Sequence, residues 1–427
     1  MKLLTLILSF SIWSTAVIAQ PKKQRILLEN ANVHIGNGQV FERGLVGIEG
    51  DQIKLVRNAL AYTYNKSDWD TIINLNGQHI YPGFVAPNST LGLTEIDAVR
   101  ASRDFDEVGI FNPHVRALIA YNCESAILQT VRTNGVLLTQ TTPRGGVITG
   151  SSSVMRTDCW NWEDGVASAD DGIHLNWPAS LQGGGWWAEP EPKKRNERYS
   201  QQKRDIESFF EMAVAYSNAK TTPTDLRFEA LKGCLKGQKR LYIHASELQQ
   251  LLDVIDFVKK YEIAFPVIVG GYDSYLIPEK LVEWKIPVML ARLHELPENE
   301  GDAVDLPYRL PFLLQKSGVK FCLQNQGEME AANARNMPFL AGTAMAYGLT
   351  EEEALRSITL SSCEIMGISK TYGSIEEGKK ATLFVSSGPA LDMRTNQATV
   401  ILIDGKFSSI TNFQTDLYTK YKKKYGL

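Results

Sequence analysis

The chain has 427 residues, of which 44% are hydrophobic and 22% are charged, and its formal net charge is −3. A chain of this length can bury a full core and still form a second, smaller domain. The balanced charge excludes the basic face or stripe that marks nucleic-acid-binding domains, so we expect no nucleic-acid partner.

Residues 1–19, MKLLTLILSFSIWSTAVIA, have one early lysine, an apolar stretch and a small-residue ending. This pattern is typical of a secretory signal peptide that is cut after Ala19. The alternative is a retained membrane anchor, but the apolar stretch is shorter than the ~20 residues that a span requires. We therefore predict an exported protein, periplasmic or secreted, with no membrane association after cleavage.

The five cysteines are widely scattered, with no CxxC pair. An odd number in an oxidising compartment allows at most two bridges and leaves one thiol over. Cys322 lies in the apolar run VKFCL, which favours a buried thiol over a metal ligand. The spacing indicates neither a disulfide framework nor a zinc–cysteine site.

Short apolar runs divided by Gly- and Asn-containing turns occupy residues 20–82 and again residues 373–412. The tight turn EGDQ lies in the first of these blocks, and such alternation is typical of short strands. All-β segments at both ends of a chain commonly meet. We predict that they form one small β-sandwich, and that residues 413–427 form a solvated C-terminal tail.

Residues 83–372 alternate strands with helices. RLYIHAS and FPVIVGG are strand-like, and ELQQLLDVIDFVKKYEI between them has apolar residues at a spacing near 3.6, as in a helix. A repeating βα unit implies a parallel sheet. The predicted fold class is therefore α/β, as a (β/α)₈ TIM barrel, which typically takes about 250 residues. A doubly wound open sheet is the alternative, although no GxGxxG follows a strand.

Residues 145–204 interrupt this rhythm with a composition rich in Gly, Ser, Trp and charge. A long segment without regular structure inside a compact domain is commonly functional or disordered. We predict a loop over the barrel mouth. Its tryptophans could stack on a substrate or simply pack the loop down; they are Trp160, Trp162, Trp177, Trp186 and Trp187.

Four motifs in chain order resemble the amidohydrolase superfamily, in the branch of imidazolonepropionase-like enzymes. They are NGQHIYPGFVAPNSTLGL, RLYIHAS, ARNMPFLAGTAMAYGLTEEEALRSITLSSCEIMGI and GSIEEGKKATLFV. The resemblance covers essentially the whole mature chain. It implies a metal-assisted hydrolase of cyclic amides or related non-peptide C–N bonds, with a small β-sandwich beside a (β/α)₈ barrel.

The family's metal ligands are mostly replaced. Its pattern has HxH after strand 1, one histidine each after strands 5 and 6, and an aspartate after strand 8. In this sequence Asn88 and Thr90 take the HxH positions, Tyr275 the strand-6 position and Gln326 the aspartate position, and only His244 remains. Amides and hydroxyls are poor ligands for transition metals. We predict no metal cofactor, with one divalent metal held weakly near His244 as the alternative, and we expect Asn88 and Thr90 to hydrogen-bond neighbouring side chains or a ligand.

Carboxylates near the predicted mouth could provide general acid–base chemistry if burial separates their pKa values. We take His244, Glu95 and Asp164 as candidate catalytic residues, while a solvated loop of ion pairs is the alternative for the two carboxylates. The candidate substrate-binding residues are Asn88, Thr90, Arg100, Tyr275 and Gln326.

Two functions stay open from the sequence. The first is an amidohydrolase acting on a small-molecule substrate. The second is a catalytically inactive relative that binds a small ligand or pairs with an active homologue, and self-association is open in either case.

Overall fold

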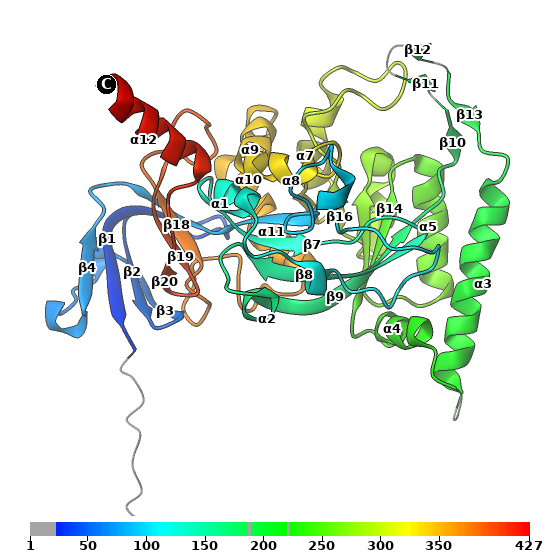
Figure 1. The fold of residues 1–427 in the computed structure, drawn as a ribbon, viewed down its shortest axis with the longest axis horizontal. Helices are drawn as coiled ribbons and strands as arrows, with labels where there is room; N and C mark the ends of the chain where they lie inside the picture. Colours follow the sequence, from blue (N-terminus) through cyan, green and yellow to red (C-terminus); the bar gives the residue numbers. More distant parts are fainter. Residues whose placement is uncertain (1–22, 184, 187–188, 191, 220–222) are drawn as a thin grey trace, which may run out of the picture.

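The computed structural model describes residues 23–183, 185–186, 189–190, 192–219 and 223–427. Two eight-stranded sheets dominate it, and Figure 1 places them beside each other along the long axis of the molecule. The predicted signal peptide lies outside the described residues. Within the described ranges, no helix combines the length and the apolar character needed to cross a membrane.

Both ends of the chain contribute to one mixed sheet, which we name the chain-end sheet. Its strands are β1 (Arg25–His34), β2 (Val40–Glu49), β3 (Gln52–Asn58), β4 (Thr71–Asn74), β5 (His79–Pro82), β18 (Leu383–Ser386), β19 (Ala398–Ile403) and β20 (Lys406–Phe407). Strand β5 runs antiparallel to β18, so the N-terminal and C-terminal blocks share backbone hydrogen bonds. The EGDQ turn joins β2 to β3, with Gly50 at φ +62°. The two-layer packing of a β-sandwich stays a prediction.

The second sheet forms the barrel. Its strands are β6 (Phe84–Ser89), β7 (Val136–Thr141), β8 (Ile148–Arg156), β9 (Val166–Asn176), β14 (Arg240–Ala245), β15 (Pro266–Gly270), β16 (Val288–Leu290) and β17 (Phe321–Leu323). They pair in chain order from β6 to β17. Buried side chains from these strands meet in one cluster that includes Val85, Leu138, Val154, Tyr242, Val267, Met289 and Cys322. A cluster shared by the first and last strands shows that the sheet curves around an interior.

The prediction of one long loop over residues 145–204 is wrong. Strands β8 and β9 lie within this segment, and β8 runs antiparallel to both of its neighbours, which replaces one βα unit of the predicted barrel by a hairpin. The Gly- and Ser-rich composition that suggested a loop belongs to a strand with small, buried side chains, such as Ser152 and Ser153. Composition misled the prediction because small polar residues also fit the crowded inside of a barrel.

The rest of that segment holds the short pieces β10 (Leu181–Gln182), β11 (Gly185–Trp186), β12 (Glu189–Pro190) and β13 (Lys194–Arg195). Of its tryptophans, Trp177 is buried and packs edge-on against Phe257, whereas Trp160 is 88% exposed. Trp187 and the side chain of Trp186 lie outside the described residues. Packing therefore explains Trp177, and nothing here ties Trp160 to a substrate.

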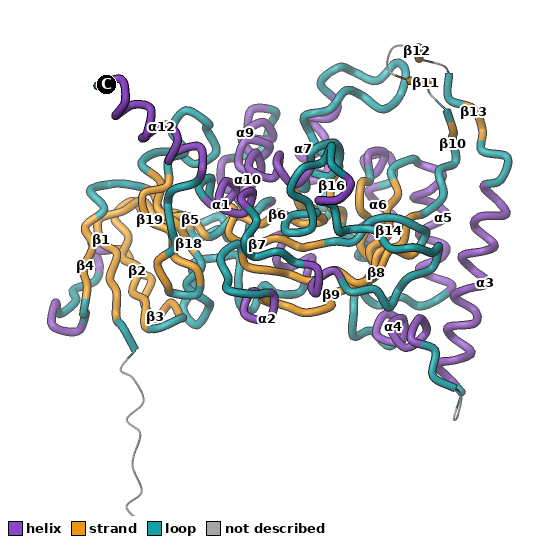
Figure 2. The backbone as a smooth tube through the Cα atoms, viewed as in Figure 1, coloured by secondary structure: helices purple, strands orange, loops and turns teal. Residues whose placement is uncertain are grey.

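Helices surround the barrel strands, as Figure 2 shows, with α3 at the edge farthest from the chain-end sheet. They are α1 (Ala126–Arg132), α2 (Trp162–Gly165), α3 (Tyr199–Asn218), α4 (Leu226–Leu235), α5 (Leu248–Lys260), α6 (Pro278–Glu283), α7 (Leu306–Lys316), α8 (Glu330–Asn333), α9 (Met337–Ala346), α10 (Glu351–Ser357), α11 (Leu360–Met366) and α12 (Phe413–Tyr425). In α5, Leu251, Val254, Ile255 and Val258 are buried at helical spacing, which confirms the predicted helix. The predicted tail is instead helix α12, which buries none of its residues.

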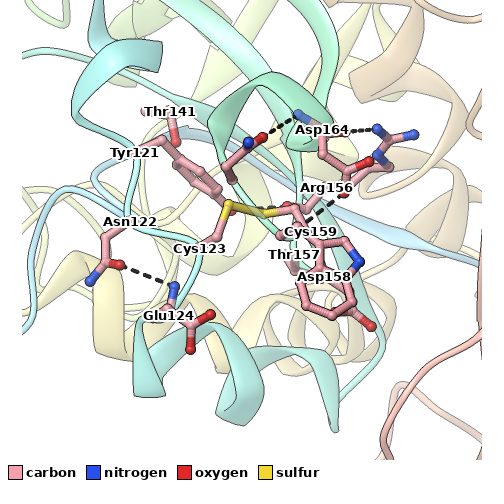
Figure 3. The surroundings of a disulfide bond; sticks show 12 residues. Tyr121, Asn122, Cys123, Glu124, Thr141, Arg156, Thr157, Asp158, Cys159 and Asp164 are labelled. Carbon is pink, nitrogen blue, oxygen red and sulfur yellow. Dashed lines mark hydrogen bonds between the residues drawn. A yellow bond between two sulfur atoms is a disulfide. The ribbon is translucent and has the colours of Figure 1, made fainter.

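One disulfide, between Cys123 and Cys159, joins the segment before α1 to the turn before α2 (Figure 3). The other three cysteines, Cys234, Cys322 and Cys363, are free and buried. Cys322 is thus the buried thiol that its apolar surroundings predict. The bridge closes a loop across 36 residues of sequence and fixes the end of the hairpin strand β8 against the barrel wall.

Candidate functional site

Several strand ends converge at one end of the barrel, which we name the mouth. In barrels of this type the loops at the carboxyl ends of the parallel strands carry the active site. Asn88 lies near the end of β6, His244 near the end of β14, and Gln326 follows β17. The Nδ2 of Asn88 donates to Oε1 of Gln326 at 2.9 Å, so two positions predicted for the site meet across 238 residues of sequence.

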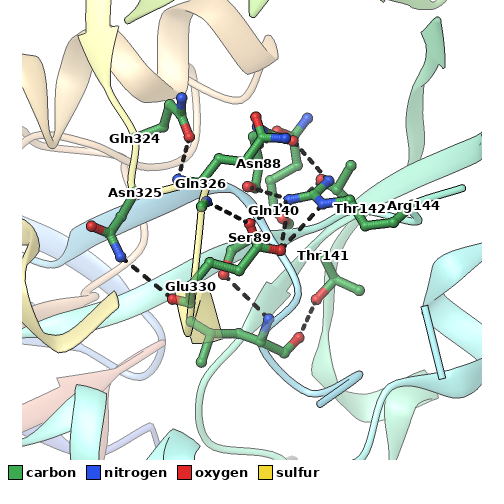
Figure 4. A network of polar contacts seen from close by, with 12 residues as sticks. Asn88, Ser89, Gln140, Thr141, Thr142, Arg144, Gln324, Asn325, Gln326 and Glu330 are labelled. Atoms are coloured by element: carbon green, nitrogen blue, oxygen red, sulfur yellow. Dashed lines mark hydrogen bonds and ion pairs between the residues drawn. The ribbon is translucent and has the colours of Figure 1, made fainter. Parts of the chain in front are cut away.

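An arginine that the sequence did not single out organises the mouth (Figure 4). Arg144 follows β7 and donates through NH1 to Oδ1 of Asn88 at 3.0 Å and through NH2 to the Asn88 carbonyl at 2.8 Å. Its NH2 group also reaches both carboxylate oxygens of Glu330, at 2.9 and 3.1 Å. The side chains of Arg144 and Glu330 are only 16% and 10% exposed, so this ion pair is largely removed from water.

Asn88 itself is held in a fixed and unusual conformation. Its φ is +48°, a left-handed geometry that asparagine tolerates better than most residues. Its backbone N–H donates to Oε1 of Gln140 at 3.0 Å, and Gln140 in turn donates to Asp171 at 2.8 Å. Burial raises the pKa of Asp171, while hydrogen bonds from Tyr242, Ser152 and Gln140 lower it. This buried network beneath the mouth fixes the direction in which the Asn88 side chain points.

His244 has a partner that the sequence did not reveal. Its Nε2 lies 2.9 Å from Nδ1 of His174, which comes from β9 and stacks on Tyr242. Burial, together with the positive charge of Arg144, lowers the pKa of His244 to about 3, although the residue as a whole is only half-buried. Burial, followed by the neighbouring His244 and then Arg144, holds the pKa of His174 well below its usual value. Both rings are therefore neutral at pH 7, and His244 is a weak proton acceptor there.

The residues at the mouth do not fit the metal centre of the resembling family. The guanidinium of Arg144 places a positive charge 3.0 Å from Oδ1 of Asn88. A metal ion bound to Asn88 would have to share this oxygen with the guanidinium and would be repelled by it. The imidazole recorded next to His244 is that of His174, 2.9 Å away. In the described part of the chain, no group of three or more His, Cys, Asp or Glu side chains is arranged to hold a metal ion. Amide and hydroxyl oxygens would have to supply the remaining ligands, and transition metals bind these poorly.

A cavity of about 720 Å³ opens at the mouth beside Arg144, Gln326 and Glu330. The other residues lining it are Thr90, Thr94, Glu95, Ile96, Asp97, Ala98, Arg103, Phe105, Ile127, Gly327, Glu328, Met329, Ala331 and Ala332. Burial raises the pKa of Asp97, and the charge of Glu330 raises it further. The hydroxyls of Thr90 and Thr94 are buried and have no hydrogen-bond partner among the described residues. The predicted bond from Thr90 to a neighbouring side chain is therefore not formed, and a bond to a ligand stays a prediction. Glu95 is a partly exposed lining residue that accepts a hydrogen bond from Asn122 at 3.1 Å.

Two predicted site residues lie elsewhere. Asp164 is in α2, at the opposite end of the barrel, because the antiparallel strand β8 carries the chain away from the mouth before α2 begins. It lines a separate cavity with Arg156 and Asp404. Arg100 is exposed and does not line the mouth cavity, although Arg103, which lies three residues later, does. Neither Asp164 nor Arg100 is positioned to act at the mouth.

Tyr275 also does not stand at a strand end. It lies in the 3-10 helix Tyr272–Leu276, beyond the end of β15, and is partly exposed. The strand ends at Gly270, with φ +103°, and a Cβ there would lie 2.5 Å from Oγ of Ser246. A histidine at Gly270 would have to displace the Ser246 side chain, so this strand end does not favour a metal-ligating histidine.

The main residues that sequence reasoning missed are Arg144 and Glu330. Arg144 had a signal, since it directly follows the predicted strand VLLTQTTP and strand ends carry sites in such barrels. Glu330 had none, because its role depends on a contact with a residue 186 positions away.

Comparison with known proteins agrees with the geometry of the fold. The profile of the amidohydrolase family matches residues 311–413. The chain is similar to the imidazolonepropionase of Flavobacterium johnsoniae, 32% identical over 84 residues, which are 19% of this chain and 20% of that protein. It is also similar to the amidohydrolase tasK of Hapsidospora irregularis, 24% identical over 172 residues, which are 38% of this chain and 17% of that protein.

Among solved structures, the fold is similar to that of an amidohydrolase from Thermotoga maritima MSB8, with a TM-score of 0.76 and 24% identity over 90% of this chain and 99% of that chain. The structural neighbours imply a TIM-barrel fold with mixed α/β content. Over the matched stretches the chain is similar to the amidohydrolase family and, within it, to imidazolonepropionases. These matched stretches span about a fifth of the curated relatives' own lengths.

Proposed function

We propose that this chain is a metal-independent member of the amidohydrolase superfamily whose mouth cavity binds a small molecule. The observation that carries the proposal is the position of Arg144, whose guanidinium bonds Asn88 and Glu330 where the family places metal ligands. A cavity of about 720 Å³ is within the range of small-molecule sites. Binding of a ligand requires the cavity but not a metal ion, so replacement of the metal ligands does not prevent it.

Hydrolysis of a non-peptide C–N bond, in a cyclic or related small amide, is the second candidate. One observation favours it: Glu95 and Asp97 both line the cavity, and burial raises the pKa of Asp97. A carboxyl group with a raised pKa can act as a general acid while a neighbouring carboxylate acts as a base. Without a metal to activate water, such a reaction should be slow by comparison with metal-assisted hydrolysis.

Turnover of small amides separates the two candidates. A panel of hydantoins, lactams and N-acyl amino acids is incubated with the mature protein, with and without a chelator, and with the Asp97→Asn variant. Binding without turnover supports a binding protein, and chelator-insensitive turnover that Asp97→Asn abolishes supports the carboxylate mechanism. Turnover that chelation removes and zinc restores would overturn both candidates.

We also propose that the protein works outside the cytoplasm, in the periplasm or secreted. The disulfide between Cys123 and Cys159 supports this, because such bridges persist in oxidising compartments. Pairing with a homologous amidohydrolase, or with a second copy of the chain, stays a prediction.

A further inference from the structure

We propose that the mouth cavity is selective for a small molecule that carries a protonated amine on an apolar body. The inference rests on the proposed function, since it names the chemical class of the molecule that the cavity binds. Three features of the lining favour such a molecule: its charge, its unpartnered hydroxyls and its apolar wall.

The charge of the lining is acidic. Arg144 and Glu330 neutralise each other through their buried ion pair. The other charged lining residues are the carboxylates of Glu95, Asp97 and Glu328 and the guanidinium of Arg103. An excess of carboxylates in a partly enclosed cavity attracts cations and repels anionic ligands.

Two buried hydroxyls in the lining lack partners. The residues Thr90 and Thr94 are 2% and 1% exposed, and neither Oγ1 has a hydrogen-bond partner among the described residues. Buried polar groups are nearly always satisfied, so each such exception calls for an explanation. Both side chains border the cavity, and rotation about the Cα–Cβ bond exchanges the hydroxyl with the methyl group. One or both hydroxyl oxygens could then accept a hydrogen bond from a donor group of a ligand in the cavity.

An ammonium group fits this set of partners. It has three N–H donors and no acceptor, and hydroxyl and carboxylate oxygens are its natural acceptors. Asp97 directly follows Ile96 and lies three residues after Thr94, all of which line the cavity, and burial together with Glu330 raises the pKa of Asp97. A cation bound nearby would favour the ionised form of Asp97, so binding of an amine would offset the burial and the repulsion from Glu330 that disfavour this carboxylate.

The rest of the wall is apolar. Phe105, Ile127, Met329 and Ala331 are among the residues that border the cavity. Such a surface contributes to binding through the area of ligand that it removes from water, and it provides no hydrogen bonds for a polar body. An amine on an aromatic or aliphatic body therefore matches both parts of the lining.

Isothermal titration of the mature chain with matched probes tests the inference. Phenethylamine, 2-phenylethanol and 3-phenylpropionate share a phenyl body and differ in carrying a cation, a neutral hydroxyl or an anion. At pH 7 we expect phenethylamine to bind about tenfold more tightly than 2-phenylethanol, and 3-phenylpropionate to bind weakest. Phenylalaninamide, added as a peptide-like amine, shows whether the amine is recognised alone or next to an amide.

Variants connect the selectivity to named residues. Asp97→Asn should reduce the preference for the amine over the alcohol to about threefold or less, and Thr90→Val and Thr94→Val should each weaken amine binding by about three- to tenfold. Glu163→Gln is the matched control, because Glu163 is exposed in α2 at the far end of the barrel and should leave binding unchanged.

If Asp97→Asn does not fold, the pH dependence of the unmodified protein replaces it. The amine preference should fall as pH is lowered and Asp97, whose pKa burial raises, takes up a proton, while binding of the alcohol stays constant. Equal or tighter binding of the alcohol or the carboxylate, unchanged selectivity in Asp97→Asn, or no binding of any probe would overturn this inference. The proposed function is judged separately, by the amide panel and the metal content.

Discussion

Arg144→Met should be among the most destabilising single changes at the mouth. The guanidinium makes contacts at 3.0 Å and 2.8 Å to Asn88 and contacts at 2.9 to 3.2 Å to Glu330. Its removal leaves the Glu330 carboxylate, 10% exposed, without a counter-charge and leaves two oxygens of Asn88 without a donor. Breaking a buried ion pair on one side costs about 3–5 kcal/mol, so we expect a loss of that size in the free energy of unfolding.

A double-mutant cycle measures how much of this loss belongs to the pair. Urea unfolding, followed by fluorescence and circular dichroism together, compares Arg144→Met, Glu330→Leu and the double variant. The double variant should be more stable than the sum of the single losses predicts, by about 2 kcal/mol or more, because it leaves no unpaired charge. The control is Arg227→Met, which breaks an exposed pair with Asp225 and should cost less than about 1 kcal/mol. A loss below 1 kcal/mol for Arg144→Met, with additive single changes, would refute the assignment of Arg144 as a buried organiser of the mouth.

Further predictions concern the histidine pair, the disulfide and an exposed segment. The pKa values of His174 and His244 are lowered in the folded protein, so the unfolded chain binds more protons below about pH 6.5. The free energy of unfolding should therefore fall as pH falls from about 6.5 towards 3. The loss should be at most about 1.4 kcal/mol per pH unit for each histidine. Urea midpoints at pH 7, 6 and 5 check this, and a flat profile would contradict it. Cys159→Ser should remove about 2–4 kcal/mol of stability by opening the bridge to Cys123, and unchanged melting in this variant would show that the bridge does not form. Trypsin should cut first in the exposed residues 192–195, and equal resistance there and in the barrel would show that this segment is packed.

The sequence predicted those parts of the fold whose pattern is local. Strand β14 and helix α5 have apolar residues at strand and helix spacing, and the structure contains both near the predicted positions. Both chain ends show the same alternation of short strands and turns, which predicted that they meet. The pairing of β5 with β18 confirms that they do. Strand β8 escaped prediction because its Gly and Ser residues lack the apolar alternation that identifies a strand.

The site was predicted only where a strand end identified it. Asn88 and Gln326 follow from the family frame, and they bond each other at 2.9 Å. The partners of His244 and Arg144 were not accessible in the same way, because His174 reaches His244 through the pairing of β9 with β14, and Glu330 reaches Arg144 from the far end of the chain order of the sheet. Contacts between residues 70 and 186 positions apart leave no local pattern in a single sequence. Asp164 was misplaced for a related reason, since a strand that runs antiparallel reverses which end of the barrel its neighbours reach.

The metal content of the purified protein tests the central claim most directly, namely that Arg144 takes the place of a metal centre. The protein is purified without chelator, exposed to zinc and manganese, desalted and analysed for metals by mass spectrometry. The Asn88→His/Thr90→His variant is treated in parallel and should bind no more metal than the unmodified chain, because the Arg144 guanidinium remains beside position 88 and Tyr275 and Gln326 still stand in place of the other ligands. The account predicts a metal content close to zero for both proteins. One or two equivalents of zinc, iron or manganese in the unmodified chain, removed by chelation and restored by the metal, would contradict it.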